Sequence, residues 1–206
     1  TVTVEGGAPL HGAEHTVMPD RITAATYLCA AASAGGDVTL RDIRPEELAT
    51  VTDALTQAGC AVERRADSLR LRAEGPLRAI PPIRTAPYPG FPTDAQASLL
   101  AALLRAGGAP VFEVFILENR YRHVDELARM GADIRTSGRV AVVTGVERLH
   151  GAPVRCTDLR GGAALCVAAL AAEGQTEVRE VQHIQRGYED LPRDLRALGA
   201  AVYEIE

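Results

Sequence analysis

Small and apolar residues recur along the chain in three similar blocks, and each block predicts the same order of helices and strands. Every block opens with an aspartate, at Asp20, Asp94 and Asp158. The runs that follow are AATYLCAAAS, AQASLLAALLRA and GGAALCVAALAAE. Because these runs have almost no polar face, they predict helices that are buried on all sides. Glycines follow each run, as expected where a helix ends.

A short strand and a second helix come after each buried helix. The alternating segments DVTLRDI, PVFEVFI and TEVREV predict the strands. In the second helix the apolar residues have helical spacing, as at Leu48, Val51 and Leu55. This helix is expected to end at a glycine, as at Gly59, and to be followed by a pair of strands. In the third block the last strand is expected at 202–205.

The repeated unit is therefore β-α-β-α-β-β, and three copies of it predict an α/β fold. The first helices lack a polar face, so they are expected inside with the sheets around them, which makes an inside-out α/β barrel. The repeats span about 19–73, 85–145 and 152–206. Together they are expected to form a single domain, 19–206.

Residues 1–18 are predicted to be an incoming crossover strand and linker. The motif LHGA occurs at 10–13 and again at 149–152, each time after a segment rich in valine. The chain is therefore expected to begin with the closing strand of a preceding repeat and to be a piece of a larger repeat protein.

Composition and charge exclude several classes of function. Of the 206 residues, 47% are hydrophobic and 24% are charged, which is typical of a globular protein. The net charge of -5 argues against a nucleic-acid partner, because phosphate backbones attract basic surfaces. No run of 18 apolar residues occurs, so no membrane association is expected. All 22 basic residues are arginine, so a lysine ammonium would have to come from outside this chain.

The four cysteines, Cys29, Cys60, Cys156 and Cys166, form no CxxC pair and no Cys/His spacing typical of metal sites. They are interpreted as reduced, buried small residues. Reduced cysteines predict a cytoplasmic protein.

Five segments resemble the enolpyruvyl transferases, and the resemblance spans essentially the whole chain. The segments are PDRI at 19–22, TAPYPGFPTDAQ at 85–96, ENRYRHVDEL at 118–127, TDLR at 157–160 and RGYE at 186–189. The two long segments favour the branch of the family that acts on UDP-N-acetylglucosamine. The shikimate-pathway branch, which shares the fold and phosphoenolpyruvate, is the alternative.

The resemblance implies a two-domain enzyme of six such repeats, with the active site in the cleft between the domains. The implied reaction moves the enolpyruvyl group of phosphoenolpyruvate to the 3-hydroxyl of UDP-N-acetylglucosamine and releases phosphate, which is the first committed step of peptidoglycan synthesis. No cofactor and no metal are implied. The family's acid and a Lys-Asn pair belong to the companion domain, so this chain alone is expected to be inactive.

Carboxylates provide the first group of candidate site residues. An aspartate before a helix is first of all a cap, which stabilises the helix by about 1 kcal/mol. The resemblance adds a role for Asp94, which would contact the 3-hydroxyl of the sugar and take its proton. It also implies that Asp158 and Asp20 bind substrate.

Arginines provide the second group, because a guanidinium presents a planar fork to phosphate or carboxylate. The resemblance implies that Arg186 contacts phosphoenolpyruvate and that Arg120 and Arg160 line the cleft. Ile116 would contact the nucleotide sugar through its backbone. Leu117 departs from the family pattern, in which many members carry Phe.

Other roles stay open at this point. His123 is expected to order its loop rather than to transfer protons.

A different function is also an alternative, namely a noncatalytic binding module that retains one substrate half-site. An enzyme of the RNA 3'-phosphate cyclase type shares related repeats, but the acidic charge and the lack of lysine argue against it.

Overall fold

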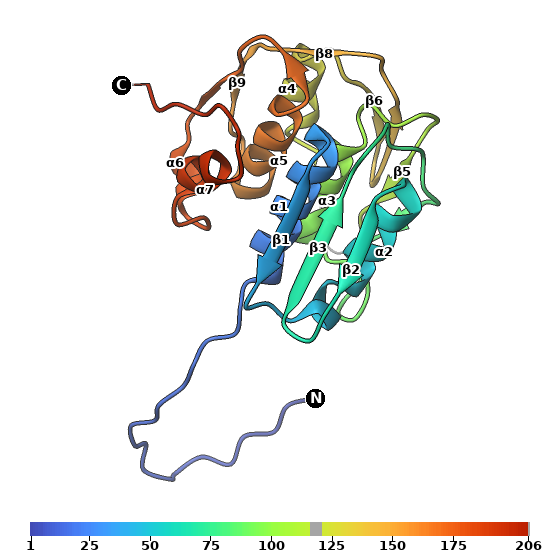
Figure 1. The fold of residues 1–206 in the computed structure, drawn as a ribbon. Helices are drawn as coiled ribbons and strands as arrows, with labels where there is room; N and C mark the ends of the chain where they lie inside the picture. Colours follow the sequence, from blue (N-terminus) through green and yellow to red (C-terminus); the bar gives the residue numbers. More distant parts are fainter. Residues whose placement is uncertain (116–120, 206) are drawn as a thin grey trace.

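Three helices form the centre of the molecule in a computed structural model that describes residues 1–115 and 121–205 (Figure 1). They are α1 (Arg21–Ala34), α3 (Thr93–Ala102) and α5 (Leu159–Ala169), and each packs on the other two. Alanines dominate their contact faces, and small side chains let helix backbones approach closely. The buried helices predicted from the sequence are confirmed.

Sheets surround these helices. The first sheet is antiparallel with the order β1-β3-β2, from β1 (Asp37–Arg41), β3 (Ser68–Arg72) and β2 (Ala61–Arg64). The second has the order β4-β5-β7-β6, from β4 (Ile83–Arg84), β5 (Val111–Glu113), β7 (Val140–Thr144) and β6 (Asp133–Ser137). In the second sheet β4 and β5 are parallel.

The third repeat contributes two parallel strand pairs. They are β8 (Leu149–His150) with β10 (Ala172–Glu173), and β9 (Pro153–Arg155) with β11 (Glu177–Arg179). Apolar side chains such as Leu71, Phe112 and Val154 are fully buried against the helices. The inside-out α/β arrangement is therefore confirmed.

Short outer helices complete the repeats. They are η1 (Pro45–Leu48) with α2 (Ala49–Ala58), then α4 (Val124–Arg129), α6 (Gln182–Gln185) and α7 (Leu191–Ala197). The helix α2 ends where Gly59 adopts a φ of 113°, a backbone conformation that residues other than glycine rarely adopt. The glycine stop predicted there is confirmed.

Both ends of the described chain lack the strands expected from the repeat. Residues 1–20 form no helix or strand and extend away from the body, with Leu10 fully exposed (Figure 1). The crossover strand at 1–18, and with it the division into 1–18 and 19–206, stays a prediction. Residues 202–205 form no strand either, so that expectation is wrong for this structure.

No helix within residues 1–115 and 121–205 is long and apolar enough to cross a membrane. All four cysteines are free thiols, and all but the half-buried Cys166 are buried. Burial raises the pKa of the Cys60 and Cys156 thiols to about 11, so both stay protonated at neutral pH.

Candidate functional site

The three aspartates of the repeats lie at the N-terminal ends of the three core helices. Asp20 accepts hydrogen bonds from the backbone N–H groups of Ile22 and Thr23, at 2.7 and 3.3 Å. Asp158 accepts two such bonds from the first turn of α5, at 3.0 and 2.8 Å. Both carboxylates therefore cap their helices, as their residue type predicts.

Asp94 does not cap its helix, so the cap predicted there is wrong. The helix α3 begins one residue earlier, at Thr93, with Pro92 at the N-cap position. The carboxylate Oδ2 of Asp94 instead lies 3.3 Å from Nη2 of Arg160. The Asp94 side chain is 40% exposed and that of Arg160 only 15%. This ion pair joins α3 to α5, and the Asp94 carboxylate is partly exposed to solvent.

A network of buried polar side chains positions Arg160. The guanidinium carbon lies 6.0 Å from the centre of the Tyr188 ring, within reach of a cation–π contact. The Tyr188 hydroxyl is 2.7 Å from Oγ1 of Thr26 on α1, which is 3.4 Å from Oγ of Ser98 on α3. Burial raises the pKa of Tyr188, so its phenol stays protonated. Side chains from all three repeats thus fix the position of one arginine.

Arg186 reaches the same end of the core through a tight turn. It ends α6 and is exposed, and its side chain forms no hydrogen bond or ion pair with the described residues. A Cβ at Gly187 would lie 2.7 Å from the side chain of Leu159, the first residue of α5. Because glycine allows this close approach, the turn packs directly on the start of the helix that carries Arg160. The structure therefore brings Asp94, Arg160 and Arg186 to one end of the molecule.

Three buried polar atoms beside this ion pair have no hydrogen-bond partner in the part of the chain that the structure describes. They are Oγ1 of Thr93 and Nε2 of Gln96 in the first turn of α3, and Nη1 of Arg160. A buried donor without a partner costs about 1–3 kcal/mol, so each is a candidate ligand contact. Analysis of the sequence did not single out Thr93, Gln96 or Tyr188. All three lie in segments that resemble the enolpyruvyl transferases, and this resemblance was the signal that could have identified them.

Two predicted site residues, Ile116 and Arg120, lie outside the described residues, as does Leu117. The segment resumes at Tyr121, whose hydroxyl donates a hydrogen bond to the backbone carbonyl of Phe112 or Arg139, at 3.1 and 3.2 Å.

His123 lies beneath the start of α5, close to Gly161, and is almost fully buried. Neither ring nitrogen has a hydrogen-bond partner among the described residues. Burial lowers the pKa of His123 to about 4, against the opposing effect of Asp158. The ring is therefore neutral at physiological pH and packs as a core residue.

This burial predicts a pH dependence of stability. The folded state binds the His123 proton only near pH 4, whereas an unfolded histidine binds it near pH 6.5. The contribution is full above pH 6.5 and is lost as the pH falls to about 4, for a total of about 3 kcal/mol. We expect His123→Leu to remove this part of the pH dependence, as measured by urea unfolding between pH 4 and 7.5. Parallel curves for the variant and the unsubstituted chain would contradict this expectation.

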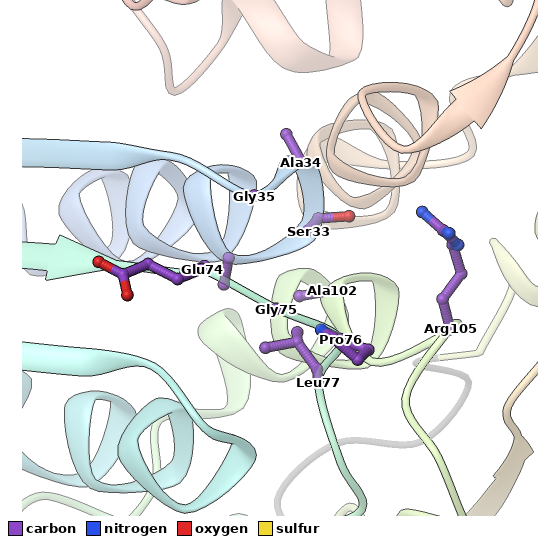
Figure 2. Close-up of a pocket in the computed structure, with 11 residues that line it drawn as sticks. Ser33, Ala34, Gly35, Glu74, Gly75, Pro76, Leu77, Ala102 and Arg105 are labelled. Carbon is purple, nitrogen blue, oxygen red and sulfur yellow. The ribbon is translucent and has the colours of Figure 1, made fainter.

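A pocket of about 410 Å³ lies at the opposite end of the core helices (Figure 2). It is lined by the last residues of α1, by 73–77, and by Ala102 and Arg105. Ser33, Glu74 and Arg105 supply its polar side chains. None of the predicted site residues that the structure describes lines it, so this pocket is separate from the candidate site.

No group of three His, Cys, Asp or Glu side chains suited to a metal ion occurs among the residues described. The guanidinium of Arg160, in the first turn of α5, suits an anionic ligand. Helix N-termini carry partial positive charge, which adds to that of the arginines.

Comparisons with known proteins identify the family of the chain. Residues 1–195 match the family model of EPSP synthase (3-phosphoshikimate 1-carboxyvinyltransferase). The UDP-N-acetylglucosamine 1-carboxyvinyltransferases of Rhodopseudomonas palustris (strain TIE-1) and Zymomonas mobilis are each 50% identical to the chain over 204 residues. Each match covers 99% of this chain and 48% of the relative. The chain thus spans about half the length of the curated relatives it matches.

Solved structures give the same fold. The enolpyruvyl transferase NikO from Streptomyces tendae matches with a TM-score of 0.80 and 31% identity, over 90% of this chain and 44% of that protein. EPSP synthase from Acinetobacter baumannii matches with a TM-score of 0.74 and 20% identity, over 97% and 50%. The resemblance found in the sequence is confirmed. This chain belongs to the EPSP synthase family of enolpyruvyl transferases.

Proposed function

We propose that this chain is one half of a UDP-N-acetylglucosamine 1-carboxyvinyltransferase and that it acts together with a companion domain of the same enzyme. The observation that carries the proposal is the placement of Asp94. Of the three aspartates that open the repeats, it is the one that does not cap its helix, and its carboxylate lies beside the largely buried Arg160 instead. Relatives that bear this enzyme's name are up to 50% identical over almost the whole chain.

In the proposed reaction Asp94 takes the proton of the sugar 3-hydroxyl. The oxygen then bonds to C2 of phosphoenolpyruvate, while the methylene carbon gains a proton from an acid on the companion domain. The adduct loses a proton from the new methyl group and releases phosphate, which restores the double bond. This chain thus supplies the base, and the companion supplies the acid.

The arginines stabilise the charges of this reaction. Arg160 and Arg186 would bind the phosphate and carboxylate groups of phosphoenolpyruvate and its adduct, since charge-assisted bidentate bonds suit both groups. Arg120 and the backbone of Ile116 are proposed as further contacts. Asp20 and Asp158 remain proposed substrate contacts through the carboxylate oxygens that do not cap. Oδ2 of each already accepts a threonine hydroxyl, at 2.9 and 3.2 Å.

The proposed enzyme is cytoplasmic and makes the first committed precursor of peptidoglycan, since its substrates are a nucleotide sugar and phosphoenolpyruvate. It needs no metal and no cofactor in this proposal.

A fusion protein tests the proposal. The half of the Rhodopseudomonas palustris relative that this chain does not cover is joined to residues 1–206, and phosphate release from phosphoenolpyruvate is measured. We expect steady release with UDP-N-acetylglucosamine from the fusion and none from the 206-residue chain alone. The isolated chain lacks the acid and half of the cleft.

Two outcomes would contradict the proposal. One is release that depends on shikimate 3-phosphate rather than on the amino sugar, which would assign the chain to the other branch. The second is a folded fusion that binds neither substrate in calorimetric titration.

A further inference from the structure

Tyr188 links the two arginines that are proposed to bind phosphoenolpyruvate. It follows Arg186 by two residues, and the carbon of the Arg160 guanidinium lies 6.0 Å from the centre of its ring. Its backbone N–H donates to the carbonyl of Ile184 at 3.1 Å, and the residue is only 3% exposed. Tyr188 therefore holds the turn of Arg186 against the core and lies beside Arg160 at the same time.

The hydrogen bonds of the Tyr188 hydroxyl have one direction. Oγ1 of Thr26 donates to the backbone carbonyl of Ile22 at 3.1 Å, and a hydroxyl has a single proton to donate. The Tyr188 hydroxyl, 2.7 Å from the same Oγ1, is therefore the donor to Thr26. The lone pairs of its own oxygen stay available to accept a hydrogen bond.

Arg160 acts on this phenol oxygen. Burial raises the pKa of Tyr188, whereas Arg160 lowers it through its positive charge and as a hydrogen-bond donor. Nη1 of Arg160 is buried and has no hydrogen-bond partner among the described residues, so the guanidinium still has a donor to offer. The polar contacts thus lead from Arg160 through Tyr188 and Thr26 to the Ile22 carbonyl, and hydrogen bonds in such a series strengthen one another.

The other side of the Arg160 guanidinium is held by Asp94, whose Oδ2 lies 3.3 Å from Nη2. A free arginine side chain has many rotamers, and a ligand that had to order it would bind more weakly. With Asp94 from the second repeat on one side and Tyr188 from the third on the other, the planar fork is oriented before a ligand arrives.

We propose that Tyr188 is a positioning residue, whose hydroxyl orients the guanidinium of Arg160 toward the charged groups of phosphoenolpyruvate and its adduct. The inference rests on the proposed function and adds to it a residue that does not itself touch the substrate. Because the hydroxyl acts through Arg160, its loss affects phosphoenolpyruvate and leaves the nucleotide sugar in place.

The first measurement follows Arg160 in the 206-residue chain and does not depend on catalysis. The NMR signal of the Arg160 Nε–H is identified by its absence from Arg160→Lys. Tyr188→Phe keeps the ring and removes the hydroxyl, and should speed the exchange of this proton with solvent about 10-fold, as for the loss of one hydrogen bond to a charged group. The matched control is Tyr27→Phe, which removes the 2.6 Å hydrogen bond from Tyr27 to Asp194 and should leave the Arg160 signal unchanged.

Substitutions of Thr26 give a second, independent pair of variants. Thr26→Ser keeps the hydroxyl that accepts from Tyr188, so the exchange of the Arg160 proton should stay as in the unsubstituted chain. Thr26→Val has nearly the same shape but lacks the hydroxyl, and should speed the exchange as Tyr188→Phe does. This pair decides the question if Tyr188→Phe does not fold.

The second measurement uses the fusion enzyme. Tyr188→Phe should lower kcat/KM for phosphoenolpyruvate about 10-fold, with the calorimetric affinity for UDP-N-acetylglucosamine nearly unchanged. Tyr27→Phe should change neither quantity. Equal losses in the two tyrosine variants would show a purely structural role and overturn the proposal, as would an Arg160 signal that Tyr188→Phe leaves unchanged. An inactive unsubstituted fusion would contradict the proposed function, and the exchange of the Arg160 proton would still decide whether Tyr188 positions this arginine.

Discussion

Replacing Asp94 with asparagine in the fusion enzyme is expected to lower turnover by at least about 10²-fold, the usual scale for loss of a general base. Asparagine has nearly the same shape and keeps an oxygen that can accept a hydrogen bond from Arg160. It cannot take the proton of the sugar hydroxyl. Binding of UDP-N-acetylglucosamine should therefore fall much less than turnover. Steady-state phosphate release and calorimetric titration measure the two quantities.

The control for this substitution is Asp190→Asn. Asp190 caps α7 by accepting a hydrogen bond from the N–H of Arg193 at 2.9 Å. Asparagine is as good a cap as aspartate, so this variant should keep full activity. If Asp94→Asn turned over within threefold of the unsubstituted fusion, Asp94 would not be the base.

The second large effect is expected for Arg186→Lys. Lysine keeps the positive charge but loses the bidentate fork of the guanidinium, so the change is not conservative at a phosphate or carboxylate site. A hydrogen bond to a charged group contributes about 1.5–3 kcal/mol, so kcat/KM for phosphoenolpyruvate should fall roughly 10- to 150-fold. The affinity for UDP-N-acetylglucosamine should stay nearly unchanged.

The geometry around Arg186 supports this assignment. The side chain is exposed and makes no ion pair with the described residues, so its loss should not destabilise the fold. The matched control is Arg196→Lys on α7, which pairs with Glu204 at 3.9 Å at an exposed site. Weakened binding of the nucleotide sugar, with phosphoenolpyruvate unaffected, would assign Arg186 to the other ligand.

Some roles in the site could be predicted from single residues. Asp20 and Asp158 cap helices because a short carboxylate side chain satisfies N–H groups that the helix itself cannot. The same reasoning was wrong for Asp94. The difference is one residue of helix: α3 begins after Pro92, which places Asp94 inside the first turn. Local pattern predicts helix ends only to within a residue or two, and here one residue separates a cap from a candidate base.

Other roles depended on contacts between distant segments. Tyr188 and Thr26 are 162 positions apart in the chain, and no local pattern indicates that their hydroxyls meet behind Arg160. Thr93 and Gln96 have buried polar atoms without a partner among the described residues, and burial likewise cannot be seen in a sequence. The motif segments around these residues were visible, but their roles were not.

The sequence by itself determined the repeat, the buried helices and the sheets outside them. These features follow from local periodicity and from helices that have no polar face to turn toward water. Only the tertiary structure decided which of the three aspartates does not cap its helix, which side chains position Arg160, and that β1 lies at the edge of its sheet. Each of these depends on the packing of one repeat against another, and such contacts are set by the whole chain rather than by any one segment of it.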